Sequence, residues 1–443
     1  MCGGGARCKR AAVKIVIVGA GIGGLTAAAL LGRSGHEVIV LEKARALSEV
    51  GAGIQISPNA ARVLASLGLA DGLAAVGTAP RRIVLRRWQD DAELFDNPLG
   101  DAVAERFGFP FLNVYRPDLI ALLATACANP DGAPANIDVR MRADVVCAHT
   151  NPEGALVELA DGSSIAADVV IGADGIHSPV RASVFGVFPT RFSGFAAYRA
   201  LVPREAVPSL PFEVTNRVGP GRHIVSYFVG RDQRHFNLVC VVPEASWEVE
   251  SWTEPGNADE LRSEFVGWAD PLQSVLALIV EPVYRWALHD REPLPRWTRG
   301  RIALLGDACH PMLPFMAQGA CQAIEDAAVL NRCLAEFGAE FVDEVASEVH
   351  ELSNTTDDGS LRALTVYESA RKSRTSILQA GSWGNATLFH LPDGPEQRQR
   401  DERYRATSGA HAVPGGDWLF GYDALTAPLP DGGERPASSE QAR

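Results

Sequence analysis

Residues 14–24 constrain this chain more than any other segment, because they join an apolar strand pattern to a glycine-rich turn. They read Lys-Ile-Val-Ile-Val-Gly-Ala-Gly-Ile-Gly-Gly, and a second apolar run ends at Glu42. Runs of β-branched residues are typical of buried parallel strands. Gly19 suits the tight turn, Gly21 lets the backbone approach a pyrophosphate, and Gly24 lets the next helix pack against the strand. The pattern predicts a βαβ dinucleotide-binding unit, with phosphates at the helix N-terminus and Glu42 on an adenosine ribose.

The same window has a second interpretation, because residues 15–32 carry no charge and follow four basic residues. A signal peptide or a membrane anchor shows a similar pattern. Five glycines disfavour a spanning helix, and the strand–turn–helix–strand order with Glu42 favours nucleotide binding. We therefore expect no membrane association and a cytoplasmic location.

Charge and cysteine usage argue against several other classes of protein. The net charge is −13, and no cluster of basic residues stands out beyond the N-terminal one, so we expect no nucleic acid partner. The eight cysteines include no Cys-x-x-Cys pair, and no Cys/His cluster has zinc spacing. We expect reduced thiols in a cytosolic protein and no metal site.

Strand and helix patterns predict an α/β fold with one domain inserted into another. After residue 186 the strand patterns become longer, and a hairpin signal at 230–233 joins two of them. Helices are predicted over 58–67, 117–128, 318–337 and 361–388, and the prolines that open the first two suit a first helical turn. A small hairpin or meander is predicted over 139–165. The predicted segments are a disordered leader (1–12), a nucleotide-binding domain in two parts (13–185 and 293–337), a substrate domain (186–292), an acidic insertion (338–360), a C-terminal helical region (361–426) and a flexible tail (427–443).

Two further motifs narrow the nucleotide to a flavin. Residues 168–181 read Asp-Val-Val-Ile-Gly-Ala-Asp-Gly-Ile-His-Ser-Pro-Val-Arg, and residues 301–326 contain Leu-Leu-Gly-Asp-Ala-Cys-His-Pro. With the N-terminal glycines, these motifs resemble those of the single-component flavin-dependent aromatic hydroxylases, in their salicylate hydroxylase-like subgroup. The resemblance covers nearly the whole chain. It implies a Rossmann-like FAD-binding domain, an inserted mixed β-sheet substrate domain and C-terminal helices.

The resemblance also implies roles at matching positions. Asp307 would hydrogen-bond the ribityl chain of FAD, Arg116 would approach the phosphates, and Gly53 would line the flavin. Asp174, with Arg181, would support both the FAD site and the NAD(P)H site. Independently of the family, the helix predicted to begin near Gly319 and Ala320 offers a positive dipole end to the reduced flavin.

The reaction implied by the resemblance uses NADH or NADPH to reduce the flavin, which takes up dioxygen and gives one oxygen atom to an aromatic ring. His223 and Tyr227 are four residues apart on one predicted strand and therefore share a face. They match family positions at the substrate pocket, where His223 would accept the substrate proton and Tyr227 would orient the ring. Arg199 would hold a carboxylate or meet the nicotinamide. Simple sheet packing, or a structural ion pair for Arg199, is the alternative interpretation.

Several functions stay open at this point. The favoured substrate is a small phenolic acid such as salicylate, since Phe315 replaces a histidine of the hydroxynicotinate-type relatives and makes one wall apolar. A secondary-metabolite ring is the alternative substrate, and a non-flavin NAD-dependent dehydrogenase is the alternative class. Cys309 and His310 are adjacent and do not suggest a hydrolase. The C-terminal region, with its Trp and Phe residues, is compatible with packing within the chain or in a homodimer.

Overall fold

The computed structural model describes residues 12–47, 52–128, 136–151, 154–247, 254–338, 359–408 and 416–431. The predicted leader lies outside this range except for residue 12. The predicted acidic insertion lies outside it except for its ends, and the same holds for most of the predicted tail.

A six-stranded sheet forms the centre of the first domain, and the βαβ unit predicted at the N-terminus is part of it. Its strand order is β19-β20-β12-β1-β2-β8, and all neighbours are parallel except β19 and β20. Residues 15–17 of β1 are fully buried, which explains their uniformly apolar character. The strands are β1 (Lys14–Val18), β2 (Glu37–Glu42), β8 (Ile137–Met141), β12 (Val169–Gly172), β19 (Thr298–Arg299) and β20 (Ile302–Leu304).

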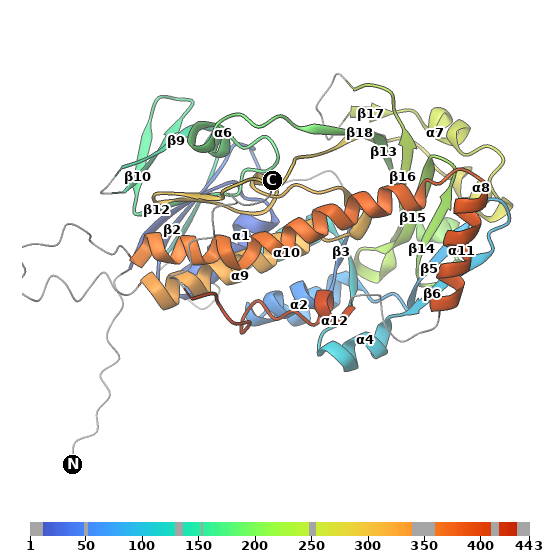
Figure 1. Ribbon diagram of the computed structural model, residues 1–443, viewed down its shortest axis with the longest axis horizontal. Helices are drawn as coiled ribbons and strands as arrows, with labels where there is room; N and C mark the ends of the chain where they lie inside the picture. The colour runs from blue at the N-terminus through green and yellow to red at the C-terminus, as the bar shows by residue number, and fades with distance from the viewer. Residues whose placement is uncertain are drawn as a thin grey trace, which may run out of the picture.

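Helices pack around this sheet, and α1 lies between two of them. It contacts α5 and α9, and α9 in turn lies beside the long α10 (Figure 1). The prolines at 58 and 117 stand in the first turns of α2 and α5, as predicted. The helices of this domain are α1 (Ile22–Arg33), α2 (Pro58–Ser66), α3 (Ala70–Val76), α4 (Gly100–Phe107), α5 (Arg116–Cys127), α6 (Pro179–Phe185) and α9 (Gly319–Phe337).

Two small sheets complete the first domain. One is an antiparallel meander in the order β11-β10-β9, in the region where the sequence predicted a hairpin or meander. Its strands are β9 (Val145–Thr150), β10 (Ala155–Leu159) and β11 (Ser164–Ala167). The other, in the order β3-β7-β4, contains β3 (Gly53–Ile56), β4 (Gly77–Thr78) and β7 (Leu112–Tyr115).

An eight-stranded mixed sheet forms the second domain, in the order β17-β18-β13-β16-β15-β14-β5-β6. The predicted range 186–292 for this domain is too short, because residues 82–98 supply two of its strands. β5 pairs in parallel with β14, while the other neighbours are antiparallel. The strands are β5 (Arg82–Arg87), β6 (Glu93–Pro98), β13 (Arg191–Pro203), β14 (Val214–Gly219), β15 (Arg222–Val229), β16 (His235–Pro243), β17 (Glu254–Gly256) and β18 (Val283–Asp290).

The two faces of this sheet meet different partners. Side chains such as Phe228 and Leu238 form one hydrophobic cluster with residues of α7 (Ala258–Glu264) and α8 (Asp270–Leu276), and we call this the outer face. Side chains of the opposite, inner face, such as Val241 and Trp286, pack against Leu313, Phe315 and the end of α10. The inner face therefore looks toward the first domain.

The C-terminal region is helical, and one helix connects the two domains. α10 (Gly359–Phe389) runs from the six-stranded sheet to the inner face of the eight-stranded sheet (Figure 1). It is followed by α11 (Pro395–Thr407), which contacts β6, and by the short α12 (Gly416–Phe420). Among the described residues, no helix combines the length and the apolar character needed to cross a bilayer.

Candidate active site

The turn after β1 requires glycine at two of the three predicted positions. Gly19 has φ +102°, and its amide donates to the Leu41 carbonyl at 2.7 Å. A Cβ at Gly19 would lie 2.4 Å from the carbonyl oxygen of Ala173, and a Cβ at Gly24 would lie 2.0 Å from the carbonyl oxygen of Gly19. Backbone atoms cannot yield at such distances, so both glycines are required for β1, β12 and α1 to pack together.

Gly21 has a different environment, which fits a pyrophosphate. A Cβ added there would meet no atom within 4 Å, so space rather than a protein contact lies beside it. Gly21 is also the N-cap of α1 and offers no capping side chain, which leaves first-turn N–H groups for an anion. Glu42 flanks the turn, and its carboxylate oxygens accept from Ala20 at 2.8 Å and from Ala44 at 2.9 Å. Lone pairs remain on both oxygens for ribose hydroxyls.

Two distant parts of the chain meet here, one with Arg116 and one with Asp307 and Gly319. A Cβ at Gly319 would lie 4.0 Å from Asp307 Oδ1, so the carboxylate lies beside the start of α9. The Asp307 side chain is solvent-accessible, yet desolvation raises its pKa, opposed by the charges of His310 and Arg116. The carboxylate is thus accessible to a bound group although its surroundings are desolvated. The Arg116 amide donates to Ala52 at 2.9 Å, which holds the start of α5 beside β3.

Ala320, the second predicted residue of the α9 start, is partly buried and packs against the main core. It places the N-terminal turn of α9 against the six-stranded sheet. These positions fit FAD, because a helix N-terminus serves the pyrophosphate at one end and a carboxylate beside a second helix N-terminus lies at the other.

Asp174 and Arg181 support the site from behind the glycine turn. Asp174 Oδ2 accepts from the Val180 amide at 3.1 Å, and burial raises the pKa of Asp174 to about 6. The Arg181 guanidinium is buried and donates to the carbonyls of Ala308 at 2.9 Å and Ile176 at 2.6 Å. Arg181 therefore ties the loop after β12 to the segment that carries Asp307.

Arg199, His223 and Tyr227 lie on the inner face of the eight-stranded sheet, and the shared face of His223 and Tyr227 is the one that their spacing predicted. Register places His223 opposite Val241 and Tyr227 opposite Asn237, with Arg199 in the row between them. Burial raises the pKa of Tyr227, and the positive charge of Arg199 opposes that shift. The Arg199 guanidinium stacks over the Trp286 ring, 3.9 Å from its centroid. This stacking fixes the plane of the guanidinium.

Gly53, which the resemblance places beside the flavin, contacts the inner face of the eight-stranded sheet. A Cβ there would lie 2.8 Å from the Tyr227 hydroxyl and 2.9 Å from Asn237 Cγ. The Gly53 amide donates to Asn237 Oδ1 at 2.9 Å. Asn237 was not predicted from the sequence, because an asparagine within an apolar strand carries no motif. Its alternation with Val239 and Val241 on the inner face is the signal that places it near the site.

His223 has a partner that sequence reasoning missed. Its Nδ1 lies 2.7 Å from Nε2 of His390, a residue 167 positions later in the chain. Both imidazoles are buried, and Phe315 and Phe389 surround His223 at ring distances of 5.1 and 5.3 Å. Burial, and then the neighbouring histidine, lower the pKa of His223 well below its usual value, and burial lowers that of His390 to about 4. At neutral pH the pair is therefore uncharged and shares one proton along its hydrogen bond.

This pair should make stability pH-dependent. His390 has a depressed pKa in the folded state, so its contribution is present above pH 6.5 and is lost as the pH falls through about 4. For His390→Asn, we expect the loss of unfolding free energy between pH 7 and pH 4 to shrink by up to about 3 kcal/mol. Urea denaturation at both pH values measures this difference. His289→Asn, at a partly exposed position of β18, is the control, and an unchanged slope in His390→Asn would contradict the assignment.

A buried charge network holds α9 against α10. Arg371 is fully buried and pairs with Glu325 and Asp326, each at 2.7 Å, while Arg374 pairs with Glu325 at 2.8 Å. His310 Nε2 lies 2.5 Å from Asp326 Oδ2. Although burial alone would raise it, the charges of His310 and Arg371 lower the pKa of Asp326 to about 2.

Cys309 belongs to the same region but not to a catalytic pair. Its thiol donates to the Gly306 carbonyl at 3.3 Å, while His310 engages Asp326 instead. These contacts agree with the rejection of a hydrolase. These contacts anchor the segment that carries Asp307.

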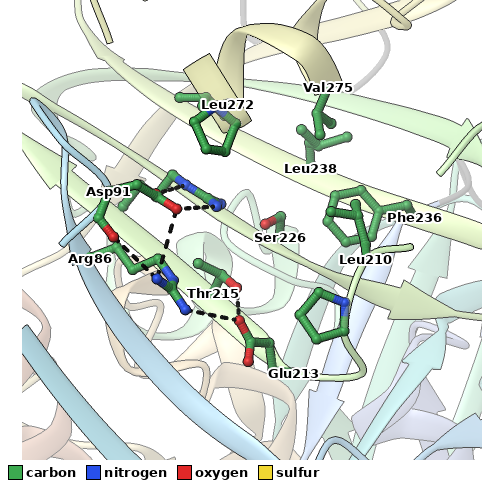
Figure 2. A pocket seen from close by; sticks show the side chains of 13 residues that line it. Arg86, Asp91, Leu210, Glu213, Thr215, Ser226, Phe236, Leu238, Leu272 and Val275 are labelled. Atoms are coloured by element: carbon green, nitrogen blue, oxygen red, sulfur yellow. Dashed lines mark hydrogen bonds and ion pairs between the residues drawn. The ribbon is translucent and has the colours of Figure 1, made fainter. Parts of the chain in front are cut away.

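A cavity of about 230 Å³ lies on the outer face of the eight-stranded sheet and is separate from this site (Figure 2). Ser226 and Leu238 line it against Leu272 of α8. Because neighbouring residues on a strand point to opposite faces, Ser226 faces this cavity while Tyr227 faces the first domain. The charges at its rim are paired, with Arg217 Nε 2.6 Å from Asp91 Oδ1. We therefore do not assign the chemistry to this cavity.

A family of FAD-binding domains matches residues 12–344 of the chain, which covers both parts of the first domain and the sheet between them. The chain belongs to this family, binds FAD and is an FAD-dependent monooxygenase. The flavin predicted from the three motifs is thereby confirmed. The non-flavin dehydrogenase, which the glycine motif alone left open, is excluded.

Similar proteins with known activities narrow the class of monooxygenase. The chain is 39% identical to 3-amino-4-hydroxybenzoate 2-monooxygenase PtnB3 of Streptomyces platensis, over 93% of this chain and 96% of the relative. It is 36% identical to 6-hydroxynicotinate 3-monooxygenase of Pseudomonas fluorescens, over 94% and 96%. A solved salicylate hydroxylase substrate complex superimposes with a TM-score of 0.74 at 25% identity, covering 93% of this chain and 96% of that chain. The predicted membership of the flavin-dependent aromatic hydroxylases is confirmed.

Proposed function

We propose that this protein hydroxylates the ring of a small aromatic acid that also carries a hydroxyl group. The observation that carries the proposal is the contact between Gly53, on the cofactor side, and Tyr227, on the face that presents Arg199 and His223. Through this contact, the groups that would orient an acidic aromatic ring lie next to the strand assigned to the flavin. The named substrates of the relatives, an amino-hydroxybenzoate and a hydroxynicotinate, are of this chemical class.

FAD would be held by the Gly21 turn, the α1 N-terminus and Glu42 at its adenosine end, and by Arg116, Asp307 and the α9 start at Gly319 and Ala320 toward the flavin. When bound, it supplies the redox chemistry: it accepts electrons from NADH or NADPH and activates dioxygen for transfer of one oxygen atom to the ring. The protein would hold the aromatic ring in position and keep water out of the site, and the transfer requires both.

The inner face has separate groups for the two polar ends of a substrate. Arg199, fixed by Trp286, can bind a carboxylate through two parallel hydrogen bonds. His223 and Tyr227 are four residues apart, which is roughly 13 Å along a strand, so they serve different parts of the substrate. Phe315 packs edge-on against His223 and supplies an apolar wall.

His223 can take a phenolic proton and pass the resulting charge to its partner. If Nε2 of His223 accepts the proton, Nδ1 can donate its own proton to Nε2 of His390, 2.7 Å away. The pair then carries one positive charge, and the phenolate left on the substrate balances it; because burial keeps both pKa values low, the proton returns readily once that negative charge is lost. His223 is thus the proposed base, and His390 is a positioning residue behind it.

The test is a substrate panel with a matched pair of arginine variants. Salicylate, other hydroxybenzoates and hydroxynicotinate are compared with phenol by NAD(P)H oxidation and by product mass. We expect at least one acid to stimulate oxidation and to gain one oxygen atom. Arg199→Met should raise KM for that acid by at least about tenfold with unchanged flavin content, because a charged hydrogen-bonded pair is lost.

Arg285→Met is the control, since Arg285 also stacks on an aromatic ring but belongs to the outer face, over Tyr198. Its KM should match that of the unaltered protein. If no acid in the panel is turned over, or if both variants behave alike, the proposed substrate class is wrong. Turnover of only a larger polycyclic ring would favour the secondary-metabolite alternative.

A homodimer and a cytoplasmic location also belong to this proposal. Trp418 and Ile377, on α12 and α10, are 44% and 54% exposed and could contact a second copy. Light scattering of the purified full chain, at several concentrations, distinguishes a dimer from a monomer.

A further inference from the structure

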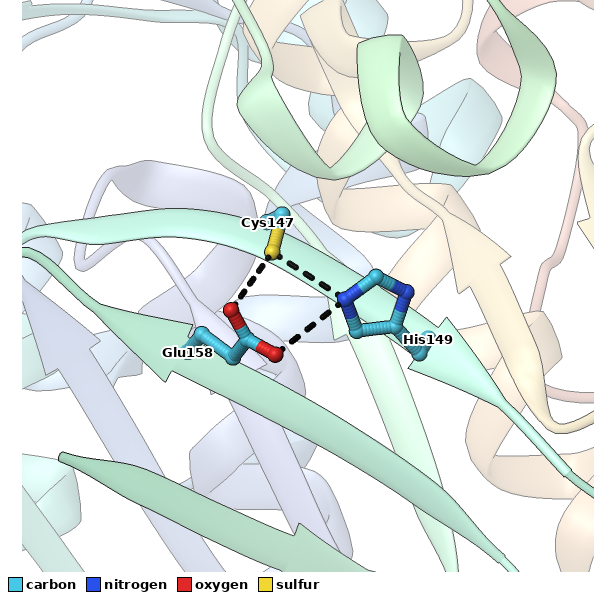
Figure 3. Close-up of side chains that lie close together, drawn as sticks. All are labelled: Cys147, His149 and Glu158. Atoms are coloured by element: carbon cyan, nitrogen blue, oxygen red, sulfur yellow. Dashed lines mark hydrogen bonds and ion pairs between the residues drawn. The ribbon is translucent and has the colours of Figure 1, made fainter. Parts of the chain in front are cut away.

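Three side chains of the small β9–β10 sheet, to which no role in FAD binding is assigned, converge on one another (Figure 3). Cys147 Sγ lies 3.3 Å from His149 Nε2 and 3.3 Å from Glu158 Oε2. His149 Nε2 lies 3.3 Å from Glu158 Oε1. The cluster thus has one thiol, one imidazole and one carboxylate at equal separations.

The pairing of the two strands accounts for this arrangement. Glu158 on β10 stands directly opposite Cys147 on β9, and His149 follows two residues later on the same face. Ala148, between them, points the other way and is buried in the main core. The side chains of His149 and Glu158 are 57% and 47% exposed, so solvent reaches the cluster. A hydrogen-bonded ladder, rather than a loose loop, holds the three groups.

The geometry points to a binding site for a divalent cation of the zinc type at Cys147, His149 and Glu158. In a tetrahedral zinc site, ligand distances of about 2.0–2.3 Å place the ligand atoms roughly 3.3–3.6 Å from one another. The closest separations here are each 3.3 Å, with Cys147 Sγ meeting Oε2 of Glu158 and His149 Nε2 meeting Oε1. A small rotation of the carboxylate would bring one oxygen to the third corner of such a tetrahedral face, and the exposed side chains leave a fourth position for a water molecule.

The donor chemistry selects the metal class. A sulfur, an imidazole nitrogen and a carboxylate oxygen together suit Zn²⁺, whereas Ca²⁺ and Mg²⁺ prefer oxygen ligands alone. On binding, the S–H bond of Cys147 breaks, the thiolate donates its electron pair to the metal, and the proton leaves to solvent. The thiolate and the carboxylate then balance the two positive charges. No electron transfer is involved.

A second cluster of Cys, His and acidic side chains among the described residues is less suited to a metal ion. Cys309, His310 and Asp326 are buried, and the Asp326 oxygens already receive Arg371, His310 and the Gly306 amide. A cation there would meet the buried Arg371 charge. Sequence spacing alone does not indicate the Cys147 cluster, because Glu158 comes from a second strand and only the strand register brings it to Cys147 and His149.

The test measures metal binding on the full-length FAD-loaded chain. Cys2 and Cys8, outside the described residues, are replaced by serine in every protein so that they contribute no thiol. Zinc is added, the protein is passed through a desalting column, and metal per chain is measured; competition with a chromophoric chelator gives the affinity. Cobalt(II) gives a second readout, since tetrahedral Co²⁺ absorbs at longer wavelengths than flavin.

We expect about one zinc per chain and a tetrahedral cobalt spectrum with thiolate character. Cys147→Ser, His149→Ala and Glu158→Gln should each weaken zinc binding at least about tenfold, while Val146→Ala, at an exposed neighbouring position, should bind as before. Flavin content and turnover should stay unchanged in all four variants. Absence of stoichiometric zinc in the unaltered chain, or equal affinity in any of the three ligand variants, would overturn the inference.

Discussion

Gly24→Ala is expected to unfold or strongly destabilise this protein, whereas Gly21→Ala should leave the apoprotein stable and remove its FAD. The first substitution places a Cβ 2.0 Å from the carbonyl oxygen of Gly19. That atom is held by the packing of β1 against α1, so the helix must shift, at a cost of about 3 kcal/mol or more. The second places a Cβ where no protein atom lies within 4 Å, at an ordinary φ of −73°.

The contrast between the two variants separates folding from cofactor binding. Since alanine restricts the unfolded chain more than glycine does, apo Gly21→Ala should unfold at the same temperature or slightly higher. Its methyl group occupies the approach of the pyrophosphate, so the flavin absorbance per chain should fall after gel filtration. Thermal unfolding with FAD stripped and flavin content after reloading measure the two effects. Equal loss of stability in both variants would show that Gly21 has a structural role instead.

Arg371→Met should lower the free energy of unfolding by about 3–5 kcal/mol. The Arg371 side chain is fully buried and donates to Asp326 Oδ1, Glu325 Oε2 and Gln322 Oε1, each at 2.7 Å. Without the guanidinium, the buried carboxylates of Glu325 and Asp326 keep their negative charges but lose the cation that balances both of them. The shift of the urea midpoint at constant slope measures the cost.

Lys372→Met is the matched control for this experiment. Lys372 is the next residue of α10 and is only partly buried, with its Nζ donating to the Pro295 carbonyl at the surface, so its loss should cost at most about 1 kcal/mol. If Arg371→Met is no more destabilising than Lys372→Met, the network does not hold α9 to α10 in the way that the contacts indicate. Arg374→Met provides an intermediate case, because Glu325 then retains Arg371.

Local patterns predicted the elements that carry the cofactor. The strand at 14–18, the helices opened by the prolines at 58 and 117, and the long helix to 337 all appear within a residue or two. The glycine spacing, the position of Glu42 and the Gly-Asp motif at 307 required no long-range information, because each is defined by a strand and the turn that follows it. Strand periodicity likewise sufficed to place His223 and Tyr227 on one face.

Long-range pairing accounts for what the sequence did not reveal. β5 and β6 contribute to the substrate sheet from residues 82–98, and nothing local indicates that a strand pairs with one more than a hundred residues away. His390 reaches His223 only because α10 ends at the inner face of that sheet. Asn237 and Trp286 act on Gly53 and Arg199 through contacts that a strand pattern cannot specify.

The length of α10 bears on how this chain can be divided. Its 31 residues span about 46 Å, with Arg371 and Arg374 along its course and His390 just past its end. A fragment limited to residues 12–344, the extent of the matched family, would retain Glu325 and Asp326 but neither arginine. In such a truncated piece the two acids would keep His310 and Asn59 but lose both cationic partners. The stability of the nucleotide-binding part therefore depends on the same helix that packs against the inner face of the eight-stranded sheet.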